Sequence, residues 1–150
     1  MLPVRKILVP TDFSEPAKEG FHKACRIAEH FGAELLVVYV NPRVPIIPAG
    51  NGAVTFNVEG YQEEVRQISK RNLEDFIVAQ QTAAVAITPF IREGEVAEEI
   101  VRTAEENHAD LIVIATHGYS GWKKFLLGSV TERVIRIATM PVLTIREPEE

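Results

Sequence analysis

Cysteine is almost absent from this chain, and long apolar runs are absent altogether. The single cysteine of the 150 residues, Cys25, cannot form a disulfide within the chain, and an isolated thiol suits a reducing compartment. No apolar run is long enough to span a bilayer. The first residues also lack the pattern of a signal peptide, because Arg5 and Lys6 lead into a short apolar run that ends at Pro10. These absences predict a cytoplasmic protein that does not enter a membrane.

An excess of positive charge is also missing. The 16 lysine and arginine residues are outnumbered by 21 aspartate and glutamate residues, so the formal net charge is −5. A net charge of this sign argues against broad electrostatic binding to nucleic acid or to an anionic membrane surface. The segment from Thr116 to Arg146 is the exception, because it carries +4 against −9 for the remainder of the chain. Its basic residues are Lys123, Lys124, Arg133, Arg136 and Arg146. An anionic ligand is expected to bind near this segment, although Arg136 and Arg146 are expected to be solvated surface residues.

Motifs of several enzyme classes are missing as well. The sequence contains no G-x-x-x-x-G-K-[ST] loop, no G-x-G-x-x-G after the first apolar run and no G-x-S-x-G nucleophile elbow. The apolar run that ends at Ile91 lacks the aspartate that a phosphoacceptor receiver domain needs at that point. No set of histidines and carboxylates has metal-ligand spacing. We therefore expect no metal site built from protein ligands, no fast enzyme and no catalytic residue.

What the chain does contain is a regular alternation of apolar patterns. With 46% hydrophobic and 25% charged residues, it fits one globular domain over 1–150. Short continuous apolar runs predict five strands buried on both faces: Ile7 to Val9, Leu35 to Val40, Val85 to Ile91, Leu111 to Ala115 and Pro141 to Ile145. Apolar residues spaced by three and four predict helices over 17–31, 61–80, 97–104 and 130–138.

Strict alternation of strands and helices predicts parallel strands joined by right-handed crossovers, hence a three-layer α/β/α sandwich. Proline is tolerated mainly on edge strands and at strand starts, so Pro89 and Pro141 favour edge positions for the third and fifth strands. The resulting strand order is 3-2-1-4-5. Winding then reverses between strands 1 and 4, and the crevice beyond their carboxyl ends is the expected ligand site. Ser14 and Pro16, after the first strand, are typical of a helix start.

Residues 41–59 interrupt the alternation. Prolines and glycines break any period there, at Pro42, Pro45, Pro48, Gly50 and Gly52. The segment is predicted to be a long irregular connection near the crevice, and loops of this length are either functional lids or plain surface loops. Both interpretations remain open.

A glycine-containing loop follows the fourth predicted strand. It begins at Ala115-Thr116-His117-Gly118 and ends at Gly128-Ser129-Val130-Thr131, where a helix is expected to start. A glycine before small hydroxyl residues at a helix start allows a close backbone approach and leaves N–H groups free for an anion. We expect the N–H groups of 128–130, with the Ser129 and Thr131 hydroxyls, to form a phosphate cradle.

Several motifs resemble those of the universal stress protein family. They are Ile7 to Ser14, Arg92 to Gly94, Ala109 to Val113, Gly128 to Val134 and Met140 to Leu143. These motifs occur in order along the chain, and the match extends over essentially all of it. The resemblance implies the adenine nucleotide alpha hydrolase-like fold. Nucleotide-binding members carry G-x2-G-x9-G-[ST], whose positions fall on Ala115, Gly118, Gly128 and Ser129. If the first position needs only close approach, the Ala115 methyl can be absorbed. If it needs a positive φ, alanine costs on the order of 1 kcal/mol.

The resemblance also implies an ATP site. Its residues would be Pro10, Thr11, Asp12, Val40, Ala115, Thr116, His117, Gly118, Gly128, Ser129, Val130 and Thr131. Val40 would meet the adenine edge through its backbone, and Mg²⁺ would bind only through the phosphates. Asp12 has a second interpretation as a turn or cap residue, and His117 as a packed loop residue.

Three functions are consistent with these features. The first is a stress or signalling protein in which bound ATP orders the 41–59 and 116–127 loops and changes a surface seen by an unknown protein partner. The alternatives are a nucleotide-free dimeric interaction module and, less favoured, a slow ATP hydrolase with Asp12 as the nearby carboxylate. A homodimer is expected in either leading case, because Pro141–Ile145 is a short apolar edge strand.

Overall fold

The computed structural model describes residues 3–43, 57–80, 84–117 and 127–146. It contains a five-stranded parallel sheet in the order β3-β2-β1-β4-β5, which confirms the predicted fold class and strand order. The strands are β1 (Lys6–Pro10), β2 (Glu34–Pro42), β3 (Ile87–Gly94), β4 (Leu111–Ala115) and β5 (Val142–Ile145). The helices are α1 (Glu15–Phe31), α2 (Val58–Gln80), α3 (Val96–Glu106) and α4 (Ser129–Ile137).

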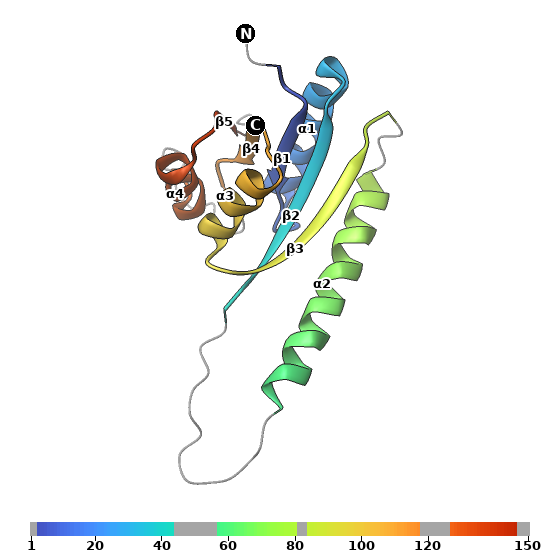
Figure 1. Ribbon diagram of the computed structural model, residues 1–150. Coiled ribbons are helices and arrows are strands. Elements are labelled where there is room, and N and C mark those ends of the chain that lie inside the picture. Colours follow the sequence, from blue (N-terminus) through green and yellow to red (C-terminus); the bar gives the residue numbers. More distant parts are fainter. Residues whose placement is uncertain (1–2, 44–56, 81–83, 118–126, 147–150) are drawn as a thin grey trace.

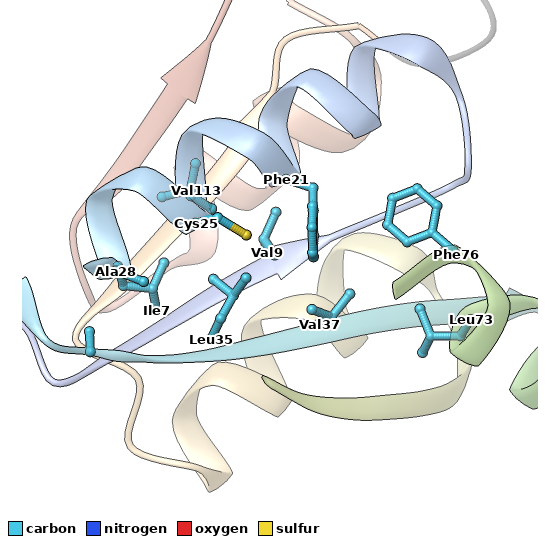
Figure 2. Packing of buried hydrophobic residues seen from close by; sticks show 12 residues of the cluster. Ile7, Val9, Phe21, Cys25, Ala28, Leu35, Val37, Leu73, Phe76 and Val113 are labelled. Atoms are coloured by element: carbon cyan, nitrogen blue, oxygen red, sulfur yellow. The ribbon is translucent and has the colours of Figure 1, made fainter. Parts of the chain in front are cut away.

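Helices cover both faces of the sheet (Figure 1). On one face, α1 and α2 pack on alternate side chains of β1, β2 and β4, and Figure 2 shows Phe21 and Cys25 of α1 beside Val9 of β1. On the other face, α3 and α4 pack on the remaining side chains, including Leu8 and Ile112. Because β1 is covered on both faces, Ile7, Leu8 and Val9 have at most 1% exposure. This is why the strands are continuous apolar runs.

The third strand lies further along the chain than predicted. It begins at Ile87 and continues past Ile91 to Gly94, with Arg92 paired to Val40 and Gly94 paired to Pro42. Edge strands tolerate charged side chains, so the polar residues at its end do not interrupt the ladder. The apolar-run criterion missed this extension because it treats charged residues as strand ends.

The predicted irregular connection is also shorter at its ends than 41–59. Asn41 and Pro42 belong to β2, and Val58 and Glu59 belong to α2. The buried amide oxygen of Asn41 accepts a hydrogen bond from the Ser69 hydroxyl of α2 at 2.8 Å. This bond explains why the strand continues through polar Asn41. Residues 44–56 of the predicted connection lie outside the described residues.

Both ends of α1 carry capping groups. Ser14 is the N-cap, and its hydroxyl oxygen accepts the Ala17 N–H at 3.3 Å, as the sequence predicts. Gly32 is the C-cap with φ of 65° and donates its N–H to the last carbonyls of the helix. Only glycine adopts this conformation without strain. The caps set where α1 starts and therefore where the loop after β1 ends.

Replacing Gly32 by alanine is expected to lower the free energy of unfolding by about 1 kcal/mol, because the new Cβ is strained at positive φ. Gly20→Ala is the matched control. A Cβ at Gly20 would lie 3.6 Å from the Ala115 Cβ, an ordinary contact, and alanine is better than glycine inside a helix by roughly 0.5–1 kcal/mol. Urea denaturation measures both variants. Equal stability of the two would contradict the assignment of the cap.

Candidate functional site

The candidate site lies where the winding of the sheet reverses. β1 and β4 are neighbours, and their following segments lead to opposite faces of the sheet. A pocket of about 320 Å³ opens beyond their carboxyl ends. It is lined by Pro10, Thr11, Asp12, Ala17, Val96, Ile100, Ile114, Ala115, His117, Gly128, Ser129, Val130 and Thr131. This is the position expected for a ligand in an open parallel sheet.

The N-terminus of α4 forms one wall of the pocket. Gly128 is its N-cap, and no side chain caps this end of the helix. The first N–H groups of a helix have no partners within the helix, so those of Ser129 and Val130 are available at the pocket wall. The helix dipole adds about 0.3–1 kcal/mol for an anion placed there. This wall is therefore suited to a negatively charged group.

Gly128 holds this helix end close to β4. Its N–H donates to the Thr116 carbonyl at 2.8 Å. A Cβ at Gly128 would lie 3.1 Å from the same oxygen, closer than nearly all real Cβ contacts. The φ of Gly128 is −61°, so the position favours glycine because of the space beside Thr116 and not because of backbone conformation.

Thr131 has a different role from the predicted one. Its hydroxyl donates to the Ala115 carbonyl at 2.8 Å, and the residue is 4% exposed. Thr131 lines the pocket, but its only hydroxyl hydrogen is directed at the end of β4. It therefore holds α4 in place, and the predicted donation from Thr131 to a phosphate does not fit this geometry. The exposed Ser129 remains the hydroxyl available to a ligand.

Ala115 adopts ordinary strand backbone. The non-glycine residues with positive φ in the described part of the chain are Phe13 and His108. The Ala115 methyl is directed at Gly20 of α1, on the face of the sheet opposite α3 and α4. The interpretation in which this position needs a positive φ is therefore wrong for this chain. The space beside Gly20 holds the methyl without a tight contact, since even a Cβ at Gly20 would lie 3.6 Å from it.

The loop from β1 to α1 forms the opposite wall. Thr11 donates its N–H to the Val38 carbonyl at 3.0 Å, and its hydroxyl oxygen accepts the Phe13 N–H. One carboxylate oxygen of Asp12 accepts the N–H and the hydroxyl of Ser14. Asp12 is also exposed and lines the pocket. The turn role of Asp12 is thus compatible with a ligand contact, so the two interpretations are not exclusive.

An aromatic contact holds this loop in a strained conformation. Phe13 has a φ of 65°, which is unfavourable for a side chain of this size. Its ring stacks on Tyr39 at 4.8 Å between centroids and meets Phe76 of α2 edge-on at 5.6 Å. These contacts fix the backbone that carries Asp12. Sequence reasoning missed Phe13, since no pattern of residue types indicates a positive φ at phenylalanine.

His117 lines this pocket and a smaller neighbouring one, and one of its ring nitrogens is buried. Its Nδ1 lies 3.0 Å from the Thr116 hydroxyl. Its Nε2 is buried and has no hydrogen-bond partner among the described residues. Buried polar atoms are nearly always paired in folded proteins. A ligand atom or a water molecule in one of these two pockets would supply the missing partner.

The structure brings most of the predicted site residues together, with two exceptions and one residue outside its range. Val40 does not line the pocket, since its side chain is 7% exposed and packs in the core with Ala97 and Ile100. The contact of its backbone with an adenine edge stays a prediction. Thr116 lines the smaller neighbouring pocket with Pro16, Glu19, His117 and Ile145. Gly118 lies outside the described residues.

Four lining residues were not predicted: Ala17, Val96, Ile100 and Ile114. Val96 and Ile100 belong to the start of α3, which follows the third strand at the same end of the sheet. The alternation of strands and helices could have predicted these two residues, because every helix of such a fold starts beyond the carboxyl end of a strand. These residues give the pocket an apolar side.

The predicted cationic segment is partly neutralised. Arg133 pairs with Glu98 at 3.3 Å, and Arg136 pairs with Glu132 at 2.7 Å. Lys123 and Lys124 lie outside the described residues. Among residues 3–43, 57–80, 84–117 and 127–146, no cluster of histidine, cysteine and carboxylate side chains has the geometry of a metal site, and no helix is long and apolar enough to cross a membrane.

The sequence and the fold of this chain are similar to those of known proteins. A model of the universal stress protein family matches residues 3–146. The universal stress protein MJ0531 of Methanocaldococcus jannaschii is 37% identical over 150 residues, which cover 97% of this chain and 84% of that protein. The structure of MJ0577 from the same organism has a TM-score of 0.76 at 28% identity and covers 99% of this chain and 100% of that one.

A universal stress protein from Archaeoglobus fulgidus, solved in complex with dAMP, has a TM-score of 0.65 at 23% identity. The match covers 96% of this chain and 99% of that one. This likeness shows a shared fold.

Replacing Thr131 by valine is expected to lower the free energy of unfolding by about 1–2 kcal/mol, because the Ala115 carbonyl loses its side-chain partner at nearly unchanged shape. Thr144→Val is the matched control, since its hydroxyl makes no hydrogen bond to another described residue. Guanidinium denaturation checks both. A Thr131→Val protein as stable as the control would refute the role assigned to the hydroxyl.

Proposed function

This chain belongs to the universal stress protein family, and we propose that it binds an adenine nucleotide in the pocket between the ends of β1 and β4. The observation that carries the proposal is the uncapped start of α4. There, N–H groups without helical partners face the pocket, and Gly128 brings them against β4. Such a helix end binds phosphate through backbone donors and the helix dipole.

The two sides of the pocket match the two parts of a nucleotide. The start of α4 and the unpartnered Nε2 of His117 offer polar groups to phosphate or sugar. Val96, Ile100 and Ile114 offer an apolar surface to a base. A volume of about 320 Å³ is at the lower end of the range for ligand pockets, about 300–1,000 Å³. The dAMP complex of a universal stress protein with the same fold supports an adenine ligand.

Within this proposal, ATP is the preferred nucleotide. The motif positions Gly118 and Ser129 and the basic pair Lys123 and Lys124 belong to the segment from the end of β4 to the start of α4, and a triphosphate would use more of these donors than a monophosphate. Mg²⁺ would accompany the phosphates. The bound nucleotide would act on the connection between β2 and α2 and on the connection between β4 and α4, and so change a surface that a protein partner recognises.

Dimerisation through β5 forms part of the same proposal. β5 is an edge strand of four residues, and Leu143 on it is 40% exposed. An apolar edge of this kind favours pairing with its copy about a twofold axis. The dimer would place two pockets in one assembly in the cytoplasm.

We favour nucleotide binding over the nucleotide-free module. The sequence feature that would favour that module is alanine in place of the first motif glycine, but the Ala115 methyl packs against Gly20 and its backbone is unstrained. Slow hydrolysis is less favoured still, because one oxygen of Asp12 already accepts two hydrogen bonds from Ser14. We therefore favour binding without turnover.

Isothermal titration is expected to show saturable ATP binding that weakens at least about tenfold in Gly128→Val, because a side chain there displaces the start of α4 from Thr116. Ser129→Ala, which leaves this backbone contact unchanged, should weaken binding by a smaller factor. Gly20→Ala, outside the pocket lining, should bind as the unaltered protein does. An unaltered protein that binds no tighter than Gly128→Val would exclude the site.

Nucleotide binding should also raise stability. At 100 times its Kd, a ligand adds about 2.7 kcal/mol to the free energy of unfolding. Thermal unfolding with ATP and Mg²⁺, ADP or AMP at equal concentration should give shifts that decrease in that order. Equal shifts would contradict the triphosphate preference, and no shift with any nucleotide would favour the nucleotide-free module.

A further inference from the structure

The two halves of α2 have different surroundings. Its buried residues, Ser69, Leu73 and Phe76, all lie in the C-terminal half, which packs on β2 and β3. The N-terminal half extends past the end of the sheet (Figure 1). A helix end of this length with few tertiary contacts gains little from packing.

The extending half nevertheless carries an apolar stripe. Val58, Tyr61, Val65 and Ile68 follow one another at spacings of three and four, which aligns them on one side of the helix. Tyr61 is 47% exposed and Ile68 is 43% exposed, while Val58 and Val65 are half-buried. Contiguous exposed apolar side chains of this kind mark interaction surfaces.

Charged side chains of opposite sign flank the stripe. Glu64 and Arg71 are seven residues apart, so they lie on the same side of the helix, two turns from each other. Both are exposed, and neither takes part in an ion pair with another residue of the described chain. By contrast, the neighbouring Arg66 pairs with Glu63 and Glu93.

We propose that this stripe is a self-association surface, on which α2 packs antiparallel against α2 of a second copy of this chain. A twofold axis between Val65 and Ile68 would place Val65 of each chain against Ile68 of the other. The point midway between Glu64 and Arg71 falls within about one residue of this axis. The axes given separately by the apolar pattern and by the charge pattern therefore agree to within about one residue.

The charges favour a second copy over an unrelated partner. In the antiparallel arrangement, Glu64 of each chain meets Arg71 of the other chain. The twofold axis therefore produces the same ion pair twice in one dimer. An acidic or a basic peptide would satisfy only one of these charges and repel the other. Tyr61 would face Asn72 at each end, where two polar groups end the apolar layer and fix the register.

The association state measures the proposal directly. Sedimentation equilibrium of the full chain at low ionic strength, over a range of concentrations, compares the unaltered protein with Glu64→Arg, Arg71→Glu and the double swap. Each single swap is expected to weaken association on the order of tenfold, since two attractions become two repulsions. The double swap should restore it, because the two positions then carry opposite charges again, with the signs exchanged. Lys70→Glu, with the same charge change as Arg71→Glu on another side of α2, should have no effect.

Ile68→Asp removes the apolar layer and should abolish the contact. The far-ultraviolet circular dichroism of every variant confirms that α2 is still folded. The test is independent of nucleotide binding and of pairing through β5. Whatever assembly the unaltered protein forms, loss of the α2 contact should reduce the mass measured by sedimentation to half or less. An assembly whose mass is the same in all the variants overturns the proposal. A monomer at every concentration, as expected if another segment of the same chain covers the stripe, overturns it as well.

Discussion

The hydrogen bond from the Gly128 N–H to the Thr116 carbonyl determines the geometry of the site. Together with the bond from the Thr131 hydroxyl to Ala115, it ties the first turn of α4 to the end of β4. The turn is uncapped, so its backbone donors face the pocket instead of a side chain of the protein. Without these two bonds, the helix end would be free to move away from the strand. The pocket wall therefore depends on one main-chain bond at a glycine, where a Cβ would be tight against Thr116, and on one side-chain bond from Thr131.

The opposite wall uses a different solution. In the loop after β1, side-chain oxygens of Thr11 and Asp12 accept the backbone N–H groups two residues further on. The strained φ of Phe13 is maintained by the stack on Tyr39. The carboxylate of Asp12 therefore lies at the pocket on a backbone that these contacts hold in place. Rigid placement of this kind lowers the entropy that a ligand contact would otherwise lose.

Sequence reasoning recovered the sheet because burial on both faces leaves a strong signal. β1, β2 and β4 are continuous apolar runs, and the prolines identified the edges. It failed where the cause is tertiary. The end of β3 is charged yet paired, Thr131 donates to a strand it does not adjoin in sequence, and Phe13 depends on rings from β2 and α2. In each of these cases, the partner lies far away in sequence.

The contact between Gly20 and Ala115 has a consequence for how such chains are recognised. The Ala115 methyl occupies space between α1 and β4, and Gly20 leaves that space free. The first position of the pattern G-x2-G-x9-G-[ST] therefore depends on how much space is left between a helix and a strand. The strand alanine is tolerated because the space that its methyl enters is large enough, since even a Cβ at Gly20 would be in ordinary contact with it. A search that reads both positions together would retain chains that the pattern alone rejects.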